Sequence, residues 1–118
     1  MNLSYLTALG KNAFAKCTNL QNVELDNCVE IGEHAFSFCE SILTASCNKV
    51  INVKEYTFEN CVSLISVSLS SCKSLEKLAF YGCENLKALS CQYTDVVDVK
   101  MNTFVSQKEQ VSVYILNA

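Results

Sequence analysis

A nine-residue phrase recurs four times along this chain at a constant interval, which restricts the fold more than any other feature. The phrase reads NAFAKCTNL, HAFSFCESI, YTFENCVSL and LAFYGCENL in turn. Its phenylalanines are Phe14, Phe36, Phe58 and Phe80, each 22 residues after the one before. A fixed period of this size is typical of a solenoid, in which each repeat forms one coil and contacts only its neighbours.

The rest of the period carries apolar residues at fixed positions. One period reads L-x-x-V-x-L-x-x-C-x-x-I and ends in A/T-F-x-x-C. The V-x-L pair alternates between apolar and polar residues, as a short strand with one buried face does. Because strands that recur once per coil run in the same direction, we predict a parallel sheet along one side of the solenoid.

The stretch from Phe to Cys has apolar residues three apart, which suits one turn of helix. We therefore predict an α/β solenoid: right-handed, with a short parallel β-sheet on one face, short helical turns on the other, and about five coils of 22 residues. One coil cannot bury its own apolar face, so the coils must share a continuous core. The whole chain, 1–118, is then a single domain. The last repeat is irregular, since Phe104 follows Phe80 by 24 residues.

The eight cysteines all fall at positions that are apolar in other coils or that follow the repeated phenylalanine. They are Cys17, Cys28, Cys39, Cys47, Cys61, Cys72, Cys83 and Cys91. A residue that exchanges with Leu and Val behaves as a small hydrophobe, so we expect buried free thiols. Disulfides are less favoured, because stacked side chains on neighbouring coils point the same way. A metal site or a reactive thiol is least favoured, since no C-x-x-C is present and burial raises a thiol pKa.

The repeated phrase resembles that of the BspA-like (Treponema-type) leucine-rich repeats, which carry I-G-x-x-A-F-x-x-C-x-x-L. The stretch IGEHAFSFCESI (31–42) nearly matches it, and two later copies match with Lys54 and Glu76 in place of the glycine. The resemblance implies a leucine-rich repeat fold. It further implies a protein of a microbial or parasite surface that binds other proteins or matrix and serves in adhesion. The chain departs from the family in having no proline, and its last repeat has Gln107 and Gln110 where Cys and Leu are expected.

The strand residues that should point away from the core form a small polar grid. The candidate partner-binding residues on it are Asn22, Glu24, Asp26, Thr44, Ser46, Asn48, Ser66, Ser68, Ser70, Ser90, Gln92 and Tyr114. This pattern is compatible with a plain solvated sheet surface. The functional alternative is a hydrogen-bonding surface for a protein partner, which is where solenoids usually bind.

The sequence lacks the residues that several classes of function require. The net charge of −3 with nine lysines and no arginine argues against nucleic-acid binding. No apolar run is long enough to span a membrane. The only histidine, His34, lies in a spacer without an organised Cys–His–Asp set, so we expect no enzyme and no catalytic residues. We likewise expect no cofactor and no metal.

The ends of the chain carry no evident cap, which leaves two hypotheses for function. One is a protein-binding module for adhesion or ligand recognition through the strand face, cut from a longer repeat array. The other is a structural module that self-associates end to end through its uncapped coils. The expected cellular location depends on whether the chain is a piece of a longer protein. A piece of a longer protein points to the cell surface or secretion, whereas a native start at Met1, with free thiols and no signal peptide, points to the cytoplasm.

Overall fold

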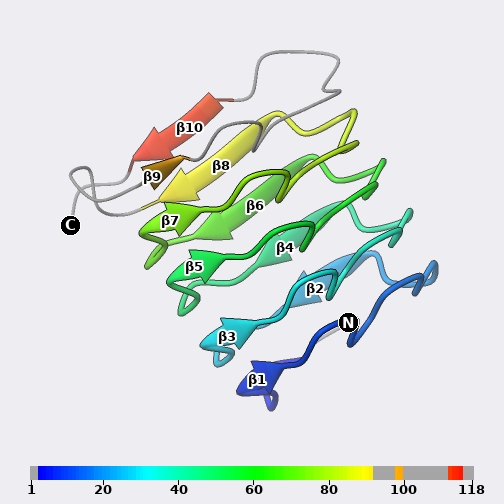
Figure 1. The fold of residues 1–118 in the computed structure, drawn as a ribbon, viewed down its shortest axis with the longest axis horizontal. Coiled ribbons are helices and arrows are strands. Elements are labelled where there is room, and N and C mark those ends of the chain that lie inside the picture. Colours follow the sequence, from blue (N-terminus) through cyan, green and yellow to red (C-terminus); the bar gives the residue numbers. More distant parts are fainter. Residues whose placement is uncertain (1–2, 92–97, 100–111, 116–118) are drawn as a thin grey trace.

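The chain winds into a parallel β-solenoid whose largest sheet has five strands. The computed structural model describes residues 3–91, 98–99 and 112–115. The strands of this sheet lie in the order β10-β8-β6-β4-β2 (Figure 1). Their bounds are β2 Asn22–Glu24, β4 Thr44–Ser46, β6 Ser66–Leu69, β8 Ala88–Cys91 and β10 Ser112–Ile115. The parallel sheet predicted from the V-x-L alternation is confirmed.

A second row of strands runs beside the first, which the hydrophobic pattern of the sequence did not predict. It consists of the pair β1-β3 and the three-stranded sheet β5-β7-β9. The bounds are β1 Ala8–Leu9, β3 Glu30–Ile31, β5 Asn52–Val53, β7 Ser74–Leu75 and β9 Asp98–Val99. Figure 1 shows the odd-numbered strands in one row and the even-numbered strands in another, with the chain turning between them.

The register of the large sheet repeats the period of the sequence. Val23 pairs with Ala45, Ala45 with Val67, and Val67 with Leu89, a step of 22 residues each time. The described residues make about four turns of this solenoid. The expected number was about five; β10 adds a fifth strand beside β8, but most residues between the two lie outside the described part.

The prediction of helical turns, and with it the α/β class, is wrong for the part of the chain that the structure describes, which contains no helix. The Phe-to-Cys stretch forms consecutive tight turns instead. Within one coil the amide of Cys39 donates to the carbonyl of Phe36 at 3.2 Å, while the amide of Phe36 donates to Thr57 of the next coil at 2.9 Å. These bonds between coils replace the i→i−4 bonds of a helix.

Two positions in every such stretch have positive φ, which a right-handed helix forbids. The first position lies two residues before the phenylalanine and the second two residues after it. In the second coil they are His34, with φ 59°, and Phe38, with φ 61°. The amides of Ala35 and Cys39 donate to Gly32 and Phe36, three residues back, so His34 and Phe38 stand at i+2, where a type II turn requires positive φ.

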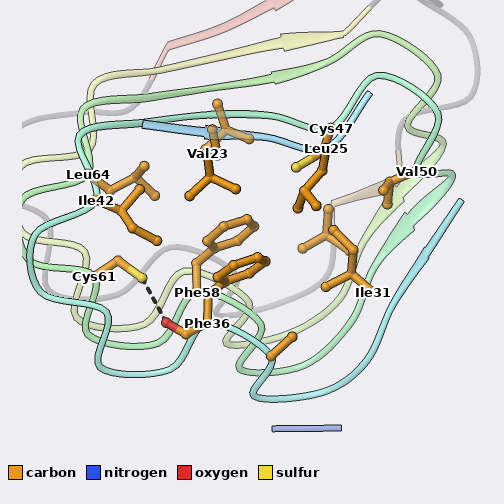
Figure 2. Packing of buried hydrophobic residues seen from close by; sticks show 14 of the residues in the cluster. Val23, Leu25, Ile31, Phe36, Ile42, Cys47, Val50, Phe58, Cys61 and Leu64 are labelled. Atoms are coloured by element: carbon orange, nitrogen blue, oxygen red, sulfur yellow. Dashed lines mark hydrogen bonds between the residues drawn. The ribbon is translucent and has the colours of Figure 1, made fainter. Parts of the chain in front are cut away.

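The core lies between the two rows of strands and the turn stretches. Phe36, Phe58 and Phe80 are buried and stack ring on ring, with centroids 5.5 and 5.3 Å apart. Figure 2 shows the rings of Phe36 and Phe58 in the centre, with Val23 above them, Leu25, Val50 and Ile31 on one side, and Ile42 and Leu64 on the other. Identical residues therefore pack against each other from coil to coil, which is how the short coils obtain a continuous core.

Candidate partner-binding face

The structure places the predicted grid residues side by side on one outer face of the five-stranded sheet. Asn22 pairs with Thr44 and Ser66, and Glu24 pairs with Ser46 and Ser68. Ser90 continues the second column beside Ser68. Tyr114 pairs with Ser90 through the backbone of β10, whereas Gln92 lies outside the described residues. We call the described members of this grid the strand face: Asn22, Glu24, Asp26, Thr44, Ser46, Asn48, Ser66, Ser68, Ser70 and Ser90.

Hydroxyl groups of the strand face donate to amide and carboxylate oxygens of the preceding coil. Thr44 Oγ1 donates to Asn22 Oδ1 at 2.9 Å, and Ser46 Oγ donates to Asp26 Oδ1 at 2.5 Å. Ser68 Oγ donates to Asn48 Oδ1 at 2.7 Å. The face is therefore a connected network of hydrogen bonds across the coils, not a set of independent side chains.

Asn48 is the central member of this network. Its Oδ1 also accepts from the amide and the hydroxyl of Ser70, at 3.1 and 2.8 Å. Its Nδ2 donates to Ser46 Oγ at 3.2 Å and faces Asp26 Oδ1 at 3.4 Å. Because the Ser70 amide can only donate, it fixes the orientation of the Asn48 side chain. The sequence pattern does not reveal this role of Asn48. Its position in the repeat is occupied by Asp26 in the preceding coil and by Ser70 in the following coil, so the repeat does not single out an asparagine.

A hollow of about 260 Å³ lies over the strand face. Its lining includes Asn22, Glu24, Thr44, Ser46, Ser66, Ser68 and Ser90, together with the buried residues Val23, Ala45 and Val67. The first two columns of the predicted grid, up to Ser90, thus line this hollow, and Asp26, Asn48 and Ser70 lie outside its lining. Small side chains on the middle coils leave the surface low enough for a partner to approach the strands.

The charges on the strand face are negative and lie toward its N-terminal end. Glu24 and Asp26 are exposed there. The ion pair between Lys54 and Glu30, at 2.8 Å, belongs to the other side of the coil, where it lowers the pKa of Glu30. Lys49 Nζ donates to Asn27 Oδ1 at 3.2 Å, at the end of the strands. Local electrostatics on the strand face are therefore acidic.

The cysteines are free thiols among the described residues, as expected, but five of them also donate a hydrogen bond to a backbone carbonyl, which the hydrophobic pattern did not predict. The Sγ atoms of Cys39, Cys61 and Cys83 donate to the carbonyl oxygens of Phe14, Phe36 and Phe58, at 3.0, 3.1 and 2.9 Å. Figure 2 shows the bond from Cys61. Burial raises the pKa of Cys39 to about 11 and raises the pKa of Cys28 and Cys47 as well. These thiols are protonated and chemically inert at neutral pH.

His34 lies in a spacer between the strands, yet its side chain is only 33% exposed. Its ring stacks on Tyr56 with centroids 4.9 Å apart, and Nδ1 lies 2.9 Å from Ser37 Oγ and 3.3 Å from Glu59 Oε1. Ser37 Oγ donates its proton to the carbonyl of Tyr56 at 3.0 Å. Because both contacts use the same ring nitrogen, this is not the relay in which one nitrogen takes a proton from serine and the other faces a carboxylate.

Among the described residues, no group of three or more His, Cys, Asp or Glu side chains could hold a metal ion. Nor does that part of the chain hold a helix long and apolar enough to cross a membrane.

Comparison with known proteins gives one match, and it covers nearly the whole chain. A family model described as a BspA type leucine-rich repeat region matches residues 3–116 in six copies. No curated protein and no solved structure matches the chain. The 22-residue register, the stacked phenylalanines and the recurring cysteines are the structural form of that repeat. The chain therefore belongs to the family of BspA-type leucine-rich repeat proteins.

Proposed function

We propose that this chain is a protein-binding module that recognises a protein or matrix ligand through its strand face, as an adhesion or ligand-recognition segment of a longer repeat array at a cell surface. The observation that carries the proposal is the hollow over β2, β4, β6 and β8, which is lined by the polar grid. Family membership supports the coarser statement that the chain is a repeat module of the kind often used in protein interactions.

The test begins with a partner found by probing an array of purified surface and matrix proteins with the labelled chain. Affinity for that partner is then measured for the double variant Ser68→Lys and Ser90→Lys. We expect binding to fall at least tenfold, because two long cations would stand over the hollow. A matched control is Ser41→Lys with Ser63→Lys, which places two lysines 22 residues apart, each two residues after the cysteine that ends a Phe-to-Cys stretch. Equal affinities of the two double variants would rule out the strand face as the contact.

A second candidate function is self-association end to end, and one observation favours it. In the first described coil Phe14 and Cys17 are only partly buried, whereas Phe36, Phe58 and Cys61 are fully enclosed. An apolar coil end of this kind can be covered by another coil. Light scattering over a concentration series separates the two functions. A constant monomer mass contradicts self-association, and growth that the substitution Phe14→Lys abolishes supports it.

A further inference from the structure

The hydrogen-bond directions on the strand face tell which chemistry a partner must bring, an inference that rests on the proposed function and makes it more specific. A serine or threonine hydroxyl has one proton to donate and two lone pairs to accept with. If the proton is already used within the face, the hydroxyl can offer a partner only its lone pairs. The direction of each bond therefore decides whether the surface recognises donors or acceptors.

Four of the six hydroxyl groups on the strand face donate their protons within the face. Ser46 faces a carboxylate oxygen of Asp26 at 2.5 Å, and an ionised carboxylate can only accept. Ser68 and Ser70 both face Asn48 Oδ1, which is identified as the oxygen because the Ser70 amide also donates to it. Thr44 donates to Asn22 Oδ1. All four hydroxyls thus present lone pairs outward.

The charged groups of the face have the same polarity, while no described hydrogen bond fixes the direction of the Ser66 and Ser90 hydroxyls. Glu24 and Asp26 are exposed carboxylates, which are acceptors with negative charge. The Nδ2 group of Asn48, a donor in the middle of the face, is directed at Ser46 and Asp26. We infer that the strand face is an acceptor surface, and that its partner is a protein segment that crosses the strands and contributes arginine or lysine side chains. Arginine fits best, since its planar fork of N–H donors can bridge two acceptors.

The probe that tests this inference is a synthetic peptide of alternating arginine and serine, compared with one of alternating glutamate and serine. Both are titrated into the ¹⁵N-labelled chain, and amide shifts are followed by NMR. We expect the arginine peptide to shift the amides of Ser46, Ser68 and Ser70, and the glutamate peptide to leave them unchanged. Equal binding of both peptides, arginine-peptide shifts confined to the turn stretches, or no shifts at millimolar peptide would each overturn the inference.

Bulk charge needs its own control, because the chain is acidic overall. The on-face variant Glu24→Gln with Asp26→Asn and the off-face variant Glu33→Gln with Glu40→Gln change the net charge equally. We expect the on-face variant to weaken arginine-peptide binding about fivefold for each charge-assisted hydrogen bond lost, and the off-face variant to change it by less than twofold. Equal effects of the two variants would mean attraction without a site.

Asn48 gives the sharpest test, because it determines the direction of two hydroxyls. Asn48→Ala releases the protons of Ser68 and Ser70, so the glutamate peptide should begin to bind and the arginine peptide should bind about fivefold more weakly. Asn48→Asp keeps an acceptor oxygen at this place and should retain arginine-peptide binding. A fold check by circular dichroism accompanies both. If an array partner requires the strand face but meets it with carboxylates, the inference fails while the proposed function stands.

Discussion

The thiol of Cys61 donates a hydrogen bond to the carbonyl oxygen of Phe36, 25 residues earlier in the chain, with an Sγ–O distance of 3.1 Å. The same carbonyl accepts the amide of Cys39 at 3.2 Å. The recurring cysteine thus links each turn stretch to the stretch before it. The thiols of Cys28 and Cys72 donate instead to carbonyls of their own coil, Glu30 and Ser74, and Val50 stands at the same position in another coil.

Valine substitution should separate the two kinds of cysteine. Cys61→Val removes the S–H donor from a fully buried, tightly packed turn and should lower the free energy of unfolding by about 2 kcal/mol. Cys47→Val should change it by less than about 1 kcal/mol, because Leu25 and Leu69 occupy the same position in neighbouring coils. Urea unfolding measures both, and equal losses would mean that the hydrogen bond of Cys61 contributes nothing.

Stability should decline in mildly alkaline solution. Burial raises the pKa of Cys39 to about 11, and the pKa of Cys61 is raised well above its usual value by its contact with Cys83 and by burial. An unfolded thiol has a pKa of about 8.5, so above that pH the unfolded chain loses protons that the folded chain keeps. The free energy of unfolding is then constant below about pH 8 and falls above pH 8.5, by up to about 1.4 kcal/mol per pH unit for each protected thiol. Chemical denaturation at a series of pH values measures this, and a flat profile to pH 9.5 would contradict it.

Thiol labelling at neutral pH should start at Cys17. This residue is partly exposed, whereas Cys28, Cys39, Cys47, Cys61, Cys72 and Cys83 are buried. We expect one fast reaction among these seven and protection of the other six until denaturant is added, as followed by mass spectrometry after a pulse of iodoacetamide. Rapid native labelling of Cys61 would show that the turn stretches open readily.

Gly82 should resist replacement for two separable reasons. Its φ of 77° lies in the left-handed region, and an added Cβ would clash with the side-chain oxygen of Asn60. Gly82→Ala should therefore cost about 1–3 kcal/mol of stability. Combining it with Asn60→Ala removes the clash and leaves only the backbone strain, so part of the loss should return. No recovery in this double variant would assign the whole cost to φ. Lys16→Gly, at the equivalent position with φ 64°, should stabilise the chain by up to about 1 kcal/mol.

The phenylalanine stack should dominate the stability of the core. Phe58→Ala removes a ring that packs between Phe36 and Phe80 and should cost about 3–5 kcal/mol, whereas Phe58→Leu should cost much less. Phe38→Ala is the control, because that side chain is 40% exposed and should change stability by under about 1 kcal/mol. Thermal unfolding checks the ranking, and a mild effect of Phe58→Ala would mean that the coils are held mainly by backbone hydrogen bonds.

The sequence by itself determined the coil length, the register of the large sheet and which residues face inward. Val23, Ala45 and Val67 could be aligned from spacing alone, because alternating side chains and an unchanging period leave one register that buries all of them. For the same reason the polar grid on the outer face was predictable residue by residue, up to Ser90.

Only the tertiary structure decided the conformation of the Phe-to-Cys stretch and the chemistry of the strand face. Apolar residues three apart fit a helical turn and a series of tight turns equally well. Tight turns form because bonds such as that from the Phe36 amide to the Thr57 carbonyl link neighbouring coils, and these bonds exist only when the next coil is in place. The short second row of strands, Glu30–Ile31 among them, is likewise defined by pairing between coils. The donor directions around Asn48 depend on residues from three coils. Interactions between coils are non-local, and a local pattern does not contain them.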